Sequence, residues 1–296
     1  MDDIKFVIPF EEEIDMSNVN FGEKIDLRGV TYSPEIRDGK FRYYRVKMDN
    51  MIFTLFPDRL VVNNSWHKFY KGNNYSDYTL EDIEKTIYKI SNLIGFDILD
   101  ADVKKVTYGI VIETDAKTNY SSWLNYKSTE PAPMIKVAKV YGRKFYLTDF
   151  NIKGYDKTYE VRANQGLKLE KKLYRVEVEV KNMKHLNKRA NPLHIYKVRD
   201  LIDYEKVQML MDDLITKHDT INKDNVYDFD KMSNKDSEAL SKLRFGQYKD
   251  YLRKKKNKTF KRYKRRVSDI NSNIENSIHT QTKRLIIEKI SNLINS

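Results

Sequence analysis

A tyrosine between two lysines is the first feature of this sequence that could carry out chemistry. If the segment from Phe150 to Lys157 is a β-strand, its alternation places Lys153, Tyr155 and Lys157 on one face. A tyrosine hydroxyl has a reference pKa of about 10, so it is a poor nucleophile unless nearby cations favour the phenolate. The two lysines could also hold a phosphate. This pattern makes Tyr155 a candidate nucleophile, although it is one of 21 tyrosines and an ordinary half-buried strand would show the same spacing.

Carboxylates on a second expected strand could complete such a site. The segment from Leu173 to Val180 alternates apolar and polar residues. Its polar face carries Arg175, which we expect to contact DNA, together with Glu177 and Glu179. If this strand lies beside the first, the carboxylates and Tyr155 line one surface, where oxygen ligands suit Mg²⁺ or Mn²⁺. Glu113, on a third expected strand, is a further candidate ligand. The ordinary alternative is a solvated sheet edge with cross-strand ion pairs.

Histidine and cysteine patterns exclude two common kinds of metal site. The sequence has no cysteine, and none of its five histidines are spaced as a metal-binding pair. His67, followed by Lys68, comes directly after an expected strand. Both are candidates for contact with DNA phosphates, and His67 could also bind a metal. A histidine in such a place is more often structural.

The clearest electrostatic feature is the segment from Arg253 to Arg266, RKKKNKTFKRYKRR. Ten of its fourteen residues are basic, none is acidic, and Phe260 and Tyr263 are interleaved. Such a segment is typical of phosphate binding that weakens steeply with salt. The alternatives are a solvated helix face and an anionic membrane surface. The residues expected here to contact DNA are Arg253, Lys254, Lys255, Lys256, Lys261, Arg262, Lys264, Arg265 and Arg266.

The composition agrees with a polyanionic partner. The 296 residues include 55 Lys and Arg against 43 Asp and Glu, for a net charge of +12. Hydrophobic residues make up 40%, enough for a sizeable core. The longest apolar runs are far shorter than a membrane-spanning helix, and the acidic first residues lack the features of a signal peptide. We therefore expect a cytoplasmic protein that does not enter the membrane.

The elements that must position these residues are strands first and helices later. Strands are expected at 41–48, 51–56, 59–62, 103–113, 134–140, 144–157 and 172–181. A capping box at Thr79–Asp82 and apolar residues at helical spacing predict a helix over 80–94, whereas the turn residues of 116–133 predict a loop. Further helices are expected over 204–217 and from Ser233 onward.

This order predicts an α+β fold, with a central, mostly antiparallel sheet, helices on one face, and a helical basic C-terminal region. We expect two domains, an α+β domain at 1–220 and a helical basic DNA-binding tail at 221–296.

Three segments in order resemble rolling-circle replication initiators of the filamentous-phage gene II and plasmid Rep type. They are Asn64–Tyr70 running to Gly72–Asn74, then Tyr155–Lys157, then Tyr174–Glu179. The resemblance covers roughly residues 40–220, and the family has a counterpart of the basic segment. It implies that Tyr155 is the nucleophile and that Glu177 is the acidic residue of the Arg-x-Glu strand. Thr107 stands where family members commonly carry an acid, so Glu113 or Asp115 substitutes for it, or only origin binding is retained.

The chemistry implied by the resemblance is attack of Tyr155 on a backbone phosphate, aided by Mg²⁺ or Mn²⁺. It leaves a 5′-phosphotyrosyl link and a free 3′-hydroxyl, which can later close a circle. The implied partners are origin DNA, single-stranded or as a hairpin, with a host helicase and polymerase. Two other hypotheses are a non-catalytic origin-binding or regulatory protein and a general RNA-binding or structural protein.

Overall fold

The chain forms two compact units in the computed structural model, which describes residues 1–14, 23–38, 40–188, 192–224, 233–244, 246–273 and 278–295. The first unit comprises Met1–Asn222 and Leu285–Ser296, and the second comprises Lys223–Arg284. We had expected 221–296 to form one tail, but the residues from Leu285 onward pack with the first unit. The reason is that Ile286, Ile290 and Ile294 are buried in the core of the first unit.

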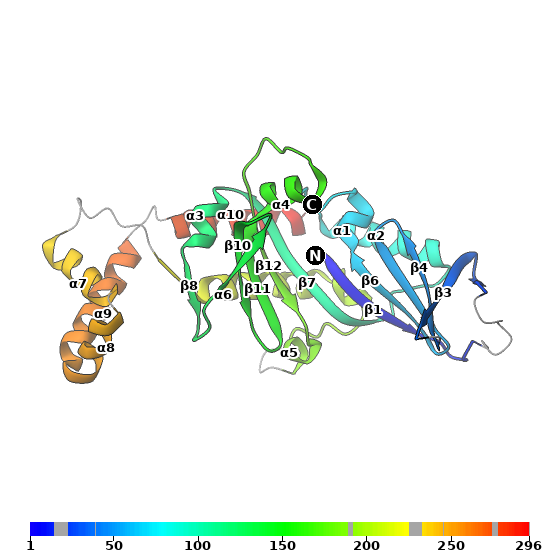
Figure 1. The fold of residues 1–296 in the computed structure, drawn as a ribbon, viewed down its shortest axis with the longest axis horizontal. Coiled ribbons are helices and arrows are strands. Elements are labelled where there is room, and N and C mark those ends of the chain that lie inside the picture. Colours follow the sequence, from blue (N-terminus) through cyan, green and yellow to red (C-terminus); the bar gives the residue numbers. More distant parts are fainter. Residues whose placement is uncertain are drawn as a thin grey trace. The chain divides into compact units, whose positions relative to one another are not determined.

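A large antiparallel sheet dominates the first unit. Figure 1 shows its strands as one continuous layer running from β3 past β1 and β7 to β10. In the described residues its order is β2-β3-β4-β5-β6-β1-β7-β12-β11-β10-β9, and a second sheet pairs β8 with β13. The strands are β1 (Asp3–Pro9), β2 (Ile25–Leu27), β3 (Val30–Arg37), β4 (Lys40–Met48), β5 (Met51–Phe56), β6 (Arg59–Ser65), β7 (Asp102–Glu113), β8 (Trp123–Tyr126), β9 (Ala132–Lys136), β10 (Lys139–Tyr146), β11 (Phe150–Asp156), β12 (Leu173–Val180) and β13 (Ile221–Lys223).

Helices follow the strands and become dominant toward the C-terminus. In the first unit α6 packs against β7, and α4 packs against β12. In the second unit α7, α8 and α9 pack on one another. The helices are α1 (Trp66–Lys71), α2 (Leu80–Ile94), α3 (Ala116–Ser121), α4 (Lys157–Gln165), α5 (Met183–Asn187), the 3₁₀ helix η1 (Val198–Leu201), α6 (Tyr204–Thr220), α7 (Asn234–Arg244), α8 (Gly246–Lys255), α9 (Asn257–Asn273) and α10 (Ile278–Ile294).

The α+β class, the central antiparallel sheet and the C-terminal helices are confirmed. The predicted helix over 80–94 is α2, whose N-cap Thr79 and Asp82 form the expected capping box. Gly95 ends it in the left-handed conformation, with φ of 68°. None of the described helices combines the length and the apolar character needed to span a bilayer.

Two expectations about local structure are wrong. The segment 116–133 is not a plain loop, because it contains α3, β8 and the start of β9. Trp123 explains this, since its fully buried ring stacks on Phe145 of β10 and fixes the segment against the sheet. The expected strand 144–157 is in fact the end of β10, a turn, β11 and the start of α4. Asp156 ends β11 by capping α4, since its side chain accepts a hydrogen bond from Tyr159 N at 2.8 Å.

Candidate functional site

Strands β11 and β12 are neighbours, so the polar residues of both share one face. Their antiparallel register places Tyr155 opposite Arg175, Lys153 opposite Glu177, and Asn151 opposite Glu179. The face is not a solvated sheet surface, because Tyr155, Arg175 and Glu177 are at most 7% exposed. The sheet therefore brings the nucleophile candidate, one lysine and both glutamates together inside the protein.

Tyr155 lies in the middle of this face with its hydroxyl buried. The hydroxyl donates to Glu177 Oε2 at 3.3 Å, and the ring packs edge-on against Tyr141 of β10. Burial raises the pKa of Tyr155 well above its ordinary value, and the nearby Arg175 cation opposes that shift only in part. In the state described by the structure Tyr155 is therefore a neutral phenol.

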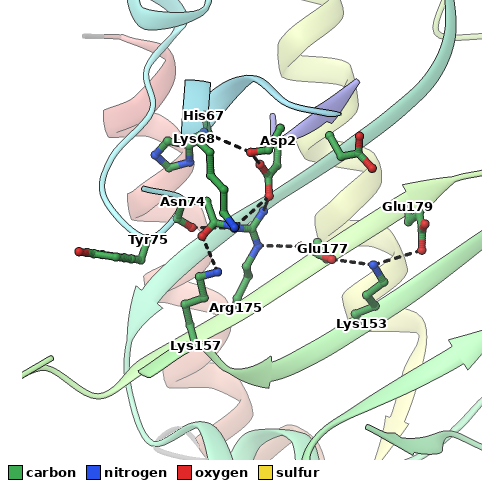
Figure 2. Close-up of polar contacts among 12 residues, drawn as sticks. Asp2, His67, Lys68, Asn74, Tyr75, Lys153, Lys157, Arg175, Glu177 and Glu179 are labelled. Carbon is green, nitrogen blue, oxygen red and sulfur yellow. Dashed lines mark hydrogen bonds and ion pairs between the residues drawn. The ribbon is translucent and has the colours of Figure 1, made fainter. Parts of the chain in front are cut away.

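Arg175 ties this face to segments far away in the sequence. Its guanidinium donates to Glu177 Oε2 at 2.7 Å, to Asp2 Oδ2 at 2.6 Å and to the Asn74 carbonyl at 2.8 Å, as Figure 2 shows. Ser65, the N-cap of α1, also donates to Asp2. Burial favours the neutral acid, but Arg175, the hydrogen bond from Ser65 and the charge of Lys157 together outweigh it and lower the pKa of Asp2 to about 2. The guanidinium is thus the centre of a closed, charge-compensated cluster.

Lys157 reaches the same cluster from the first residue of α4, not from a strand. Its side chain is completely buried, and its ammonium donates to Asn74 Oδ1 at 2.8 Å and to Glu160 Oε2 at 2.7 Å. It lies 5.9 Å from the centre of the Tyr155 ring. Burial, with help from the Arg175 charge, lowers the pKa of Lys157 to about 8. A lysine in this condition can give up a proton near neutral pH.

Lys153 joins the two glutamates of β12. Its ammonium lies 2.9 Å from Glu177 Oε1 and 3.1 Å from Glu179 Oε2 (Figure 2). Burial works against charge on Lys153, but the two carboxylates outweigh it and raise its pKa. Burial also favours neutral Glu177, yet Arg175 and Lys153 keep its pKa below the ordinary value. Asn151 and Lys153 similarly lower the pKa of Glu179 to about 2 against the effect of burial.

The residues present do not fit a resident divalent cation. The oxygens of Glu177 and Glu179 are already bound by protein cations, whereas a Mg²⁺ site needs them free. Gly109 of β7 is the residue opposite Glu177, and Glu113 lies four residues further along the same strand. Glu113 forms an ion pair with the exposed Lys171 and not with this face. Within the described ranges no three His, Cys, Asp or Glu side chains are grouped to hold a metal. Binding of Mg²⁺ or Mn²⁺ by these three glutamates stays a prediction that this arrangement does not favour.

The residues proposed to replace the missing family acid have other partners. Thr107 is buried opposite Glu179. Asp115 is the N-cap of α3, where its side chain accepts from Thr118 N at 2.9 Å. Its carboxylate is thus committed to the local turn.

His67 belongs to the rim of the cluster as a neutral ring. It stacks on Tyr78 with ring centres 4.7 Å apart, and burial lowers its pKa to about 3. The imidazole is therefore uncharged in this structure, and contact of His67 with phosphate or with a metal stays a prediction. Lys68, on the same helix, is partly exposed, and Figure 2 shows its side chain pointing toward the cluster. Contact of Lys68 with DNA stays a prediction.

Three members of the cluster were missed by sequence reasoning. Asn74 lies in the Gly72–Asn74 turn of a segment that the family resemblance had already marked. Glu160 follows Lys157 at the i, i+3 spacing of a helical ion pair, a signal that the strand assignment hid. Asp2 had no recognisable signal, because only the pairing of β1 with β6 and β7 brings it to Arg175.

The second unit presents the basic segment on α8 and α9. Tyr263 of α9 packs with Leu252 and Ala239, and Phe260 lies against them. The two aromatic rings therefore face the core of this unit and are not available to stack on bases. Most of the basic side chains are exposed, and the described residues give no carboxylate partner to seven of them. These seven, called the basic surface below, are Lys254, Lys255, Lys256, Lys258, Lys261, Lys264 and Arg265.

Three of the expected DNA contacts, Arg253, Arg262 and Arg266, lie apart from this set. Arg266 pairs with Asp236 at 2.5 Å, and Arg253 lies 3.4 Å from Asp250. Arg262 stands over the Tyr263 ring at 5.4 Å. An arginine already held by a carboxylate contributes less to binding a phosphate, so the basic surface is the stronger candidate.

Comparisons with known proteins show a distant similarity to solved structures. No protein-family model matches the sequence, and no curated protein matches it. One solved structure that is similar is that of a rolling circle replication initiator protein from Geobacillus stearothermophilus, at 11% sequence identity and a TM-score of 0.38. The similarity covers 79% of this chain and 88% of that chain. A similarity this distant says nothing about the chemistry of this chain.

Proposed function

We propose that this protein initiates rolling-circle replication by binding origin DNA and by cutting and rejoining one strand through Tyr155. The observation that carries the proposal is the hydrogen bond from the Tyr155 hydroxyl to Glu177, inside a cluster that also holds the cations of Arg175, Lys153 and Lys157. A phenol beside a proton acceptor and several cations is the combination that attack on a phosphodiester requires.

The cluster can supply each proton transfer of the reaction from its own residues. Tyr155 oxygen would attack the phosphorus atom while its proton passes to Glu177, and the bond from phosphorus to the 3′-oxygen would break. Lys157, with its lowered pKa, would protonate the departing 3′-oxygen. The products are a 5′-phosphotyrosyl bond and a free 3′-hydroxyl, and the reverse sequence rejoins the strand.

The closed cluster holds this chemistry back until DNA arrives. In the absence of a phosphate, Arg175 and Lys153 lower the pKa of Glu177 while burial raises that of Tyr155. Proton transfer between them is then strongly unfavourable. A bound phosphate would compete for the two cations, restore the basicity of Glu177 and stabilise the charge on the attacked phosphate. DNA binding therefore has to open the cluster before the strand is cut.

Formation of a covalent adduct tests the proposal. The full-length protein is incubated with a supercoiled plasmid that carries the DNA surrounding its own reading frame, with either Mn²⁺ or EDTA, and the products are separated in denaturing gels. We expect a protein–DNA adduct from the wild type and none from Tyr155→Phe, whose affinity for the plasmid stays nearly unchanged. Tyr146→Phe, which alters an exposed tyrosine of β10, is the matched control. An adduct from Tyr155→Phe would move the nucleophile elsewhere, and a requirement for Mn²⁺ would overturn the metal-free proton transfers.

A non-catalytic DNA-binding protein is the second candidate, and one observation favours it. Tyr155 is 7% exposed and its hydroxyl is inside a cluster without free carboxylate ligands for a metal. Under this hypothesis the basic surface of the second unit provides DNA affinity, and the cluster only stabilises the fold. This candidate would be supported if the protein binds the plasmid sequence-specifically but forms no adduct in either Mn²⁺ or EDTA.

A further inference from the structure

The turn between β9 and β10 has a backbone conformation that its own residues disfavour. Val137 and Ala138 form a two-residue hairpin turn with φ of 47° and 56°. Positive φ at both positions makes this a type I′ turn, for which Asn-Gly is the ordinary choice. A β-branched residue rarely adopts this conformation. Since Val137 is 79% exposed, packing does not offset the strain.

The residues next to the turn are also unfavourable for an isolated hairpin. Lys136 lies directly opposite Lys139, and like charges in that relationship repel. The neighbouring pair is Ile135 opposite Val140, with 62% and 42% exposure. The described residues give neither lysine a carboxylate partner, although the Lys139 ammonium lies 4.6 Å from the centre of the Tyr159 ring. The hairpin end thus presents aliphatic side chains beside two uncompensated positive charges.

The hairpin is firmly joined to the neighbourhood of Tyr155. The buried Tyr159 of α4 donates from its hydroxyl to the Lys136 carbonyl at 2.8 Å. Tyr141 of β10 contacts both Tyr155 and Tyr159, with ring centres 5.9 Å apart in each case. Between Pro131 and Thr148 the sequence contains four basic residues and no acidic one. A ligand held at this end of the hairpin would be polyanionic and would lie close to the candidate site.

We propose that the turn from Lys136 to Lys139 is a nucleic-acid wedge, an inference that rests on the proposed function. Lys136 and Lys139 bind backbone phosphates, and Val137 presses against the bases of a distorted or unpaired step. Proteins that kink or open a duplex commonly insert an aliphatic side chain between bases and flank it with cations. Backbone strain of this kind is often found at residues that contact a ligand. The wedge would expose the strand that Tyr155 attacks.

A variant with an unstrained turn distinguishes a role of the turn in unstacking DNA bases from a role in protein stability. In the full-length variant Val137→Asn/Ala138→Gly the turn acquires the sequence that its conformation prefers. The melting temperature of this variant should therefore equal or exceed that of the wild-type protein. The probe is a short DNA duplex with a mismatched step next to 2-aminopurine, whose fluorescence rises when the base unstacks. We expect the wild type to raise this fluorescence and the variant to lose the rise while it still binds the duplex.

A second variant tests the phosphate contacts of the same turn. Loss of two phosphate contacts in Lys136→Ala/Lys139→Ala should reduce the slope of log affinity against log salt by about 2. Lys104→Ala/Lys197→Ala, which removes two lysines that pair with Asp102, is the matched control and should leave the slope unchanged.

The outcomes distinguish this inference from the proposed function. If the turn variant unstacks the probe as well as the wild type does, the wedge is wrong and the initiator proposal stands. If the wild type binds no DNA at all, both are wrong. If the turn variant keeps its effect on DNA but loses affinity for phosphatidylglycerol vesicles, the turn contacts a membrane and the nucleic-acid assignment is overturned.

Discussion

Lys153 and Glu177 form an ion pair across β11 and β12, with Lys153 Nζ 2.9 Å from Glu177 Oε1. The same ammonium binds Glu179, so Lys153 bridges both carboxylates that the sequence had offered to a metal, while Arg175 also pairs with Glu177 and Lys144 with Glu179. These ion pairs compensate the charges of the buried Glu177 and the partly buried Glu179 with cations of the protein itself.

Removing this ammonium should create a metal site. In Lys153→Ala the carboxylates of Glu177 and Glu179 lose their shared cation, so we expect Mn²⁺ to bind about tenfold more tightly than to the wild type, a difference of roughly 1.4 kcal/mol. Titration calorimetry or the electron paramagnetic resonance signal of Mn²⁺ measures this directly. Lys153→Ala/Glu179→Gln is the control and should lose the gain. Equal or tighter binding of Mn²⁺ by the wild type would show that Lys153 does not exclude the metal.

Loss of Arg175 should destabilise the first unit severely. Arg175→Met leaves the buried carboxylates of Asp2 and Glu177 without their main cation, and breaking a buried pair from one side costs about 3–5 kcal/mol. The free energy of unfolding, measured by urea titration at pH 7, should fall by that amount. The deficit should shrink at pH 4, where the orphaned carboxylates can take up protons.

Lys171→Met gives the comparison for this substitution, because its ion pair with Glu113 is largely exposed and should contribute little. Equal stability of Arg175→Met and the wild type at pH 7 would mean that the cluster is not a source of stability.

His67 should make the protein lose stability below pH 6.5. Its folded pKa of about 3 lies below the ordinary 6.5, so the unfolded chain binds more protons in between, and stability falls as the pH drops through that window. The expected loss is on the order of 2 kcal/mol at pH 5. His67→Phe keeps an aromatic ring against Tyr78 and should flatten this dependence. His194→Asn, at an exposed position, should keep it, and an unchanged slope in His67→Phe would place the titrating group elsewhere.

The basic surface should supply most of the salt-dependent affinity for DNA. Changing Lys258, Lys261, Lys264 and Arg265 to glutamine removes up to four phosphate contacts, and the slope of log affinity against log salt should fall by about 3 to 4. Fluorescence anisotropy with a labelled duplex at several salt concentrations measures the slope. A slope that stays at the wild-type value would assign α9 to another partner.

Alternation along each strand was enough to predict that Lys153 and Tyr155 share one face of β11 and that Arg175 and Glu177 share one face of β12, but only the fold made these two strands neighbours. The shared face within each strand follows because side chains of a strand point to opposite faces with a period of two, whatever the rest of the fold does. The α2 capping box and the C-terminal helices were also local properties, readable from Thr79 and from residue spacing. The basic segment likewise predicted its own exposure, since so many like charges cannot be buried.

Tertiary structure alone decided what the polar face of β11 and β12 touches. Asp2 and Asn74 reach Arg175 from positions more than a hundred residues away in the chain, and no local pattern encodes such contacts. Lys157 was expected at the end of a strand but is the first residue of α4, because the Asp156 side chain caps that helix. Strand alternation alone does not reveal where a helix cap ends the strand. Burial followed from these contacts, and burial is what sets the proton affinities of Tyr155, Lys157 and His67 and so fixes the resting state of the site.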